Sequence, residues 1–222
     1  MRFSNIAFDL DGTLYPNFRL YVRLIPFLLK DQRLLRAMGK ARDELRNTQA
    51  YDGDFYKTQA RLMGKHLEIP VEAIMEQTER LIYRGWEPHF KKIALFSHVI
   101  KTLDAFAKAG IKLGLLSDFP AEKKLENLGI KNYWQVVLCS EEVGRLKPDP
   151  ASFLELAHKM EAEPEQILYV GNSLPYDVEG ANKAGMKTAL IRRSRKKLSD
   201  QLNAKPDFVF HDYRQLRDYV LG

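Results

Sequence analysis

The sequence predicts an α/β fold with a parallel sheet at its core and an all-helical segment inserted after the first strand. From residue 97 to the carboxyl end, short apolar runs alternate with helical patterns of about a dozen residues, which is typical of parallel βαβ units. Residues 15–88 do not follow this alternation, and their apolar side chains recur at helical spacing. We therefore expect a parallel sheet whose chain is interrupted once by a group of helices.

The predicted strands of the core are short and apolar. The first covers residues 3–8, has no helical period and precedes a polar cluster, as expected of a buried strand that ends in a loop. Further strands are expected at residues 111–116, 134–138, 167–170, 187–191 and 207–210. The helices are expected at residues 97–109, 121–128, 150–160, 175–184 and 213–221, with glycine or proline marking several of their ends.

The inserted segment contains three helical patterns. The clearest is an apolar stripe at steps of three and four residues, formed by Leu34, Met38, Ala41 and Leu45. A second stripe follows Pro70, which stands in a helix-opening position, and a weaker one covers residues 55–67. Pro26 is expected to kink or end the helix that begins near Arg19. The simplest interpretation is a small all-helical subdomain.

Composition narrows the class of protein. The chain has 222 residues, of which 45% are hydrophobic and 29% charged, a balance typical of one globular domain with a modest insertion. Its longest apolar stretches fall far short of the ~20 residues of a membrane span, and no secretory signal is visible. The single cysteine, Cys139, excludes an internal disulfide. We expect a cytoplasmic protein with no membrane partner, either a monomer or a homodimer.

The formal net charge is +6, which favours anionic partners without specifying them. The basic residues gather in two places, residues 19–46 and residues 192–197. The second run has no interleaved aromatic residues and no recognisable nucleic-acid-reading motif, so we do not expect nucleic acid as a partner. Both runs are interpreted first as solvated surfaces.

The polar cluster after the first strand has the sequence DLDGT, residues 9–13. Asp9 and Asp11 project to the same side of an extended chain, at the carboxyl end of a strand, where open α/β sheets bind their ligands. Two neighbouring carboxylates repel each other unless a shared proton or a hard cation relieves them, and Mg²⁺ with oxygen ligands is the usual solution. Gly12 lets the chain turn away sharply.

Three further motifs follow this cluster in order. Residues 6–14 read IAFDLDGTL, residues 113–118 read LGLLSD, residues 144–150 read GRLKPDP and residues 167–181 read ILYVGNSLPYDVEGA. Together they resemble the four motifs of the haloacid dehalogenase (HAD) superfamily, and an ordered set is far more specific than one motif. The resemblance implies a Rossmann-like α/β core at residues 1–14 and 89–222, with residues 15–88 as the helical first-position (C1) cap.

The resemblance also implies a role for each matching residue. Asp9 would be the nucleophile that forms an aspartyl-phosphate, and Asp11 would act first as general acid and then as general base. Ser117 would hydrogen-bond a phosphoryl oxygen, and Lys147 would place a cation against the phosphoryl group and Asp9. Ser117, Asp118 and Lys147 would bind substrate, and the candidate metal ligands are Asp9, Asp11, Asn172 and Asp177.

Asn172 departs from the family pattern, which often has aspartate at this position. An amide still offers a carbonyl oxygen to Mg²⁺, with one negative charge fewer, so we expect weaker metal binding. Two arrangements stay open. Either Asn172 is the direct ligand with Asp177 behind it, or Asp177 binds the metal directly or through water.

These motifs predict a Mg²⁺-dependent phosphatase acting on a small phosphorylated metabolite. Dehalogenases of the superfamily generally lack an acid at the position of Asp11, which argues for phosphoryl chemistry. A phosphomutase is an alternative because it uses the same acids, and Asn172 leaves open a catalytically weakened, anion-binding member. Nucleotide monophosphates, sugar phosphates and glycolate-type phosphates all remain open as substrates.

The basic stretch of the cap supplies the last expectation. Arg19 and Arg23 follow soon after the catalytic loop and so have the shortest tether to it. We expect them to contribute to the capture of an anionic substrate more than the basic residues of 33–46 do. The alternative is that both arginines only solvate a helix face.

Overall fold

The computed structural model describes residues 2–48, 53–192 and 204–222. Its described strands form one sheet of six parallel strands in the order β3–β2–β1–β4–β5–β6. They are β1 (Asn5–Phe8), β2 (Lys112–Ser117), β3 (Val136–Cys139), β4 (Ile167–Gly171), β5 (Lys187–Ile191) and β6 (Phe208–Phe210). The first strand therefore lies inside the sheet, between β2 and β4.

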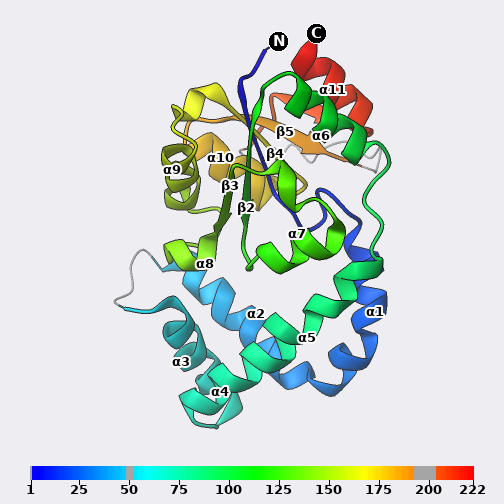
Figure 1. The fold of residues 1–222 in the computed structure, drawn as a ribbon. Helices are drawn as coiled ribbons and strands as arrows, with labels where there is room; N and C mark the ends of the chain where they lie inside the picture. The colour runs from blue at the N-terminus through cyan, green and yellow to red at the C-terminus, as the bar shows by residue number, and fades with distance from the viewer. Residues whose placement is uncertain (1, 49–52, 193–203) are drawn as a thin grey trace.

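Helices cover both faces of this sheet (Figure 1). They are α6 (Val99–Lys108), α7 (Glu122–Leu128), α8 (Ser140–Val143), α9 (Pro150–Lys159), α10 (Glu179–Lys183) and α11 (Tyr213–Leu221). Short 3₁₀ turns lie at Lys131–Tyr133 and Pro164–Gln166, and a π-helical turn at Leu174–Val178 precedes α10. The predicted parallel α/β core is confirmed, with element ends that differ from expectation by a few residues.

Side chains of β1 alternate between two hydrophobic clusters, as the two-residue period of a strand requires. Ile6 and Phe8 point into the cluster that includes side chains of α6 and α11. Ala7 points into the cluster that includes side chains of α9 and α10. Because β1 is buried on both faces of the sheet, the packing of both hydrophobic clusters fixes its position.

The segment between β1 and α6 is helical and lies below the sheet in Figure 1. It contains α1 (Asn17–Lys30), α2 (Gln32–Asn47), α3 (Phe55–Leu67), α4 (Val71–Thr78), a π-helical turn (Glu79–Tyr83), α5 (Arg84–Trp86) and a 3₁₀ turn (Glu87–Lys92). The predicted stripe of α2 is buried, with Leu34, Met38 and Ala41 in a cluster shared with α3 and α4.

Pro26 does not end α1, which continues to Lys30. Leu20 and Leu24, one helical turn apart, are buried in the same hydrophobic cluster as β1, and Phe27 and Leu28 pack against that cluster. This packing holds the helix together across the missing amide hydrogen of the proline. The first helix of the insertion therefore rests on the sheet domain.

Two further expectations concern the surface. No helix in the described part of the chain is long and apolar enough to cross a membrane. The basic run at residues 192–197 lies outside the described residues except for Arg192.

Substitution of Gly180 on α10 tests how tightly this helix packs on the sheet domain. A Cβ at Gly180 would lie 2.3 Å from Cε2 of the Phe153 ring on α9, so Gly180→Ala should destabilise the fold by about 1–3 kcal/mol through overpacking. The matched control is Gly39→Ala on α2, where nothing lies within 4 Å of the added carbon. It should stabilise the fold by about 0.5–1 kcal/mol. Urea unfolding measures both, and equal effects would contradict this packing.

Candidate functional site

The candidate site lies where three neighbouring strands end. Asp9 follows β1, Ser117 ends β2 and Asn172 follows β4. The backbone N–H of Asp9 donates to the carbonyl of Val170 (2.9 Å), which extends the pairing of β1 and β4 into the site. Since parallel strands end at one edge of the sheet, these residues meet there.

Lys147 and Asp9 form the buried centre of the site. Lys147 Nζ lies 2.7 Å from Asp9 Oδ1 and 2.7 Å from Asp177 Oδ1. The other oxygen of Asp9 accepts a hydrogen bond from Thr13 Oγ1 (2.6 Å). Burial alone would lower the pKa of Lys147, but the Asp177 and Asp9 carboxylates hold that pKa well above its ordinary value. The side chain is therefore an ammonium ion placed between two carboxylates.

Asp177 also shapes the loop after β4. Its Oδ2 accepts hydrogen bonds from the backbone N–H groups of Asn172 (3.0 Å) and Ser173 (2.9 Å). The carboxylate comes so near the strand end that a Cβ at Gly171 would lie 2.3 Å from Cβ of Asp177. Both oxygens of Asp177 therefore have protein partners, and the side chain of Asn172 is presented beside the turn at Gly12.

Oxygen atoms suited to a hard cation surround a cavity of about 280 Å³ that includes Asp9, Asn172 and Asn17 in its wall. Asn172 Oδ1 lies 3.3 Å from Thr13 Oγ1. Asn17 Oδ1 is buried and has no hydrogen-bond partner, which marks it as an acceptor without a donor. In the described residues no group of three or more His, Cys, Asp or Glu could hold a metal. The donor set therefore suits a hard divalent cation in its atom type but is poor in carboxylates.

Asp11 lies in the wall of the same cavity and of a second one. Its Oδ2 forms an ion pair with Lys124 Nζ (2.8 Å), and its Oδ1 accepts a hydrogen bond from Tyr15 Oη. The Asp11 carboxylate is thus held in a wall that the two cavities share, and the first cavity also contains Asp9, Lys147 and Asp177. Asp9 and Asp11 line this cavity together but have different hydrogen-bond partners, and their pairing around one cation stays a prediction.

Ser117 and Asp118 have different surroundings although they are adjacent. Ser117 is buried, and its Oγ accepts from the N–H of Phe119 (3.2 Å), so its hydroxyl hydrogen can be donated. The Asp118 carboxylate accepts from Ser140 Oγ (2.6 Å) and from the backbone N–H of Lys147 (3.1 Å). These partners let Asp118 position the chain near Lys147. Asp118 also lies in the wall of the cavity that contains Asp9, so its expected part in substrate binding stays a prediction.

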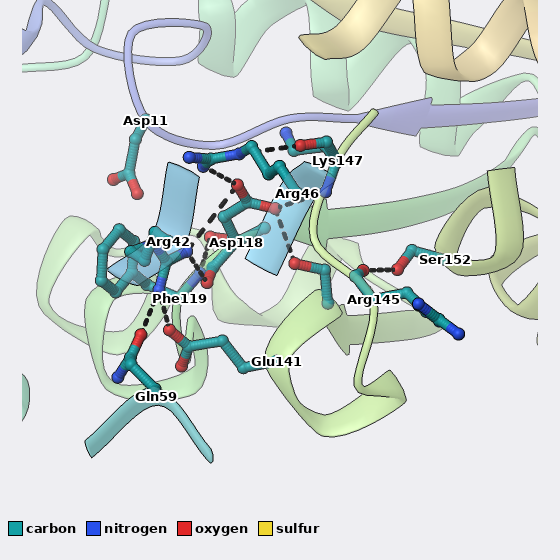
Figure 2. Close-up of polar contacts among 12 residues, drawn as sticks. Asp11, Arg42, Arg46, Gln59, Asp118, Phe119, Glu141, Arg145, Lys147 and Ser152 are labelled. Atoms are coloured by element: carbon teal, nitrogen blue, oxygen red, sulfur yellow. Dashed lines mark hydrogen bonds and ion pairs between the residues drawn. The ribbon is translucent and has the colours of Figure 1, made fainter. Parts of the chain in front are cut away.

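Two arginines of α2 connect the helical segment to these loops (Figure 2). Arg46 donates from Nη2 to Asp118 Oδ2 (2.9 Å) and from Nε to the backbone oxygen of Lys147 (3.0 Å). Arg42 is buried, forms an ion pair with Glu141, and donates from Nη2 to the backbone oxygen of Asp118 (2.9 Å). Helix α2 thus holds both the loop after β2 and the loop that carries Lys147.

Arg19 and Arg23 do not reach the site. Both are exposed, and neither belongs to the walls of the two cavities described above. Arg23 donates from Nη2 to the backbone oxygen of Lys92 (3.2 Å). Leu20 and Leu24 take the buried face of α1, so the arginines one position before each lie toward solvent. A short tether along the chain does not bring these side chains into the two cavity walls, because helix orientation decides the direction of a side chain. Their expected contribution to substrate capture stays a prediction.

Several residues of the site were not singled out from the sequence: Thr13, Asn17, Arg42, Arg46 and Lys124. Arg42 and Arg46 are four residues apart and each follows a residue of the buried stripe. A cationic pair bordering an apolar stripe was the one sequence feature that pointed to them. Asn17 and Lys124 lie in no recognisable pattern, and only the fold places them.

Comparison with known proteins identifies the family to which this fold and its motifs belong. The family model for haloacid dehalogenase-like hydrolases matches residues 6–191. The chain is 30% identical to the glyceraldehyde 3-phosphate phosphatase of Methanopyrus kandleri, over 97% of this chain and 96% of that protein. It is also 30% identical to the phosphoglycolate phosphatase of Escherichia coli, over 81% of this chain and 77% of that protein. The predicted resemblance is confirmed.

Solved structures share the fold. A HAD phosphatase from Thermococcus onnurineus superposes with a TM-score of 0.66 at 23% identity, covering 99% of this chain and 98% of that one. A 2-haloacid dehalogenase from Pseudomonas syringae superposes with a TM-score of 0.68 at 23% identity, covering 97% of each chain. Since a phosphatase and a dehalogenase match about equally well, the fold alone does not select the chemistry.

The Arg42–Glu141 pair should matter for stability. Burial raises the pKa of Glu141 to about 7, although Arg42 opposes the rise, and Glu141 Oε2 is buried without a hydrogen-bond partner. Arg42→Met removes the cation and should lower the free energy of unfolding by about 3–5 kcal/mol, because the carboxylate stays buried. Arg36→Met, on the exposed face of α2, is the matched control and should change it by at most about 0.5 kcal/mol.

A double variant separates this cause from general damage to α2. Adding Glu141→Gln to Arg42→Met removes the uncompensated charge, so the double variant should recover part of the lost stability. Chemical unfolding of Arg42→Met, Glu141→Gln, the double variant and the parent chain measures the coupling. Additive losses would mean that the pair is not the reason for the effect.

Proposed function

The chain belongs to the family of haloacid dehalogenase-like hydrolases, and we propose that it is a Mg²⁺-dependent phosphatase that hydrolyses small phosphomonoesters through an aspartyl-phosphate on Asp9. Its phosphatase relatives support phosphoryl chemistry. The observation that carries the proposal is the buried Lys147 ammonium 2.7 Å from Asp9, with a second acid, Asp11, in the wall of the same cavity. A nucleophile, a cation and a separate proton carrier are the minimum that phosphomonoester hydrolysis needs.

The first half of the proposed reaction uses Asp9 and Asp11. A carboxylate oxygen of Asp9 attacks phosphorus, and the bond from phosphorus to the ester oxygen breaks. The leaving oxygen takes the proton from Asp11. Lys147 offsets the negative charge that gathers on the phosphoryl oxygens, and the Ser117 hydroxyl donates to one of them.

The second half restores the enzyme. Asp11, now ionised, accepts a proton from a water molecule whose oxygen attacks the same phosphorus atom. The bond between phosphorus and Asp9 breaks, inorganic phosphate leaves, and Asp11 again carries the proton. Asp11 thus donates a proton in the first half and accepts one in the second. Both transfers require that Asp11 lie beside the ester oxygen.

The metal ligands that we propose are Asp9 and Asn172, with the unpartnered Asn17 Oδ1 as a further donor. We propose that Asp177 does not bind the metal directly, because its carboxylate already accepts hydrogen bonds from Lys147 and from the backbone N–H groups of Asn172 and Ser173. It positions the loop that carries Asn172. The Asp11 side chain is not among the proposed ligands, because its oxygens contact Tyr15 and Lys124 and it is needed as the proton carrier. When bound, Mg²⁺ would neutralise phosphoryl charge and help to align the ester with the nucleophile.

We further assign residues 15–88 the role of a cap over the site. Side chains of α1, the two turns near α5 and the loop after β2 line one cavity together. The arginines of α2 tie this segment to the loop that carries Lys147. A substrate held between the cap and the sheet domain would be shielded from water during the first step.

Asp9→Asn tests the nucleophile. An amide cannot form the acyl phosphate, so kcat should fall by at least about a thousandfold. The control is Asp218→Asn on the exposed face of α11, which should retain the parent kcat. Mass spectrometry of acid-quenched parent enzyme should locate a phosphate on the peptide that contains Asp9. Near-normal turnover by pure Asp9→Asn protein would remove Asp9 from this role.

Asn172→Asp tests the metal site. The added carboxylate should lower the Mg²⁺ dissociation constant by about tenfold, because a hard dication gains affinity with each charged oxygen ligand. Calorimetric titration with Mg²⁺ measures this without turnover, and Asn182→Asp, which lies outside the cavity, is the control. Unchanged Mg²⁺ affinity in Asn172→Asp, with a strong loss in Asp177→Asn, would make Asp177 the direct ligand.

A further inference from the structure

A second cavity of about 280 Å³ adjoins the one that contains Asp9. The two share Asp11, Asn17 and Phe119 in their walls. A phosphomonoester with its phosphorus atom at Asp9 would therefore extend its alcohol part past Asp11 into this second cavity, which we name the leaving-group cavity. Its walls come from the helical segment on one side and from the loop after β2 with α7 on the other.

Aromatic side chains dominate the wall of the leaving-group cavity. They are Tyr21, Tyr83, Trp86, Phe90 and Phe119. The hydroxyl of Tyr83 is committed elsewhere, since it donates to Glu141 Oε1 (3.1 Å) and lies 3.3 Å from Gln59 Nε2. Aromatic side chains in a cavity wall stabilise flat apolar groups.

The charges of the cavity disfavour a second anion on the substrate. Both of its lysines are already paired, Lys124 with Asp11 (2.8 Å) and Lys123 with Glu126 (2.7 Å). Glu87 and Glu122 add two further carboxylates to the wall. A carboxylate on the leaving group would meet this negative charge and would have to compete with Asp11 for Lys124.

The volume of the leaving-group cavity also favours a ring over a short chain. The volume lies near the lower end of the range of small-molecule sites, about 300–1,000 Å³. A leaving group of two or three carbon atoms would fill little of it and would leave water against the aromatic walls. A ring of five or six atoms could displace that water and contact Trp86 and Phe119.

We propose that the preferred substrates are phosphomonoesters of uncharged, ring-bearing alcohols, an inference that rests on the proposed phosphatase function. These substrates differ from those in the names of the relatives, glyceraldehyde 3-phosphate and phosphoglycolate, which have no ring. Trp86 and Phe119 are the residues that select the ring.

The first experiment compares benzyl phosphate with glycerol 3-phosphate and phosphoglycolate. All three release an alkoxide and not a phenoxide, so intrinsic reactivity does not decide the order. Benzyl phosphate should show a kcat/KM at least about tenfold above the other two, and 4-carboxybenzyl phosphate should fall about tenfold below benzyl phosphate. A higher kcat/KM for glycerol 3-phosphate or phosphoglycolate, or equal values for the two benzyl esters, would overturn the inference.

A matched pair of variants tests whether the leaving-group cavity is responsible for the preference for ring-bearing substrates. Trp86→Ala should lower the ratio of kcat/KM for benzyl phosphate to that for glycerol 3-phosphate by about tenfold. Met75→Ala, in the wall of a different cavity of the helical segment, should leave the ratio unchanged. An unchanged ratio in Trp86→Ala would contradict the assignment.

Binding without turnover separates this inference from the proposed function. Trp134 Nε1 is buried without a partner, so Trp134→Phe loses no hydrogen bond and leaves Trp86 as the single tryptophan. In that variant, benzyl phosphate should change the Trp86 fluorescence at concentrations at least about tenfold below those of glycerol 3-phosphate. If no ester is hydrolysed but this order holds, the phosphatase proposal fails and the ring selectivity stands. Equal binding of both esters would refute the ring selectivity.

Discussion

The ammonium group of Lys147, buried between the carboxylates of Asp9 and Asp177, is the interaction on which the site depends. Burying two carboxylates would be strongly unfavourable without a cation at hydrogen-bond distance from both. The Asp177 carboxylate in turn holds the amides of the loop after β4. One cation therefore fixes the ends of β1 and β4 and the loop before α9 as a single charged cluster.

The helical segment is coupled to this cluster through backbone and side-chain contacts. Arg46 donates to the backbone oxygen of Lys147 and to Asp118, and Asp118 accepts from the backbone N–H of Lys147. The backbone of Lys147 is thus held from both sides, once by the helical segment and once by the sheet domain (Figure 2). Docking of α2 and the position of the central cation are consequently linked, although no residue of α2 lies in the wall of the cavity that contains Asp9.

The two acids of the first motif show how neighbouring residues acquire different surroundings. Asp9 is enclosed with Lys147 and Thr13, whereas Asp11 lies between two cavities with Lys124 and Tyr15. Spacing in an extended strand predicted that both would face one cation. Both acids line one cavity, and that pairing stays a prediction. The isolated bridge between Asp11 and Tyr15 shows that the chain folds back on itself directly after Asp11.

By itself the sequence determined the parallel α/β core and the inserted helices, because strand and helix periods are local. Its motifs also placed Asp9, Ser117 and Asn172 at strand ends, where the structure has them. Only the tertiary structure decided which cations face the site. Arg42 and Arg46 contact groups 76 and 101 residues away in the chain, whereas Arg19 and Arg23 turn to solvent. A helical pattern shows which side chains share a face, but the partner of that face depends on how the helix packs, which local sequence does not encode.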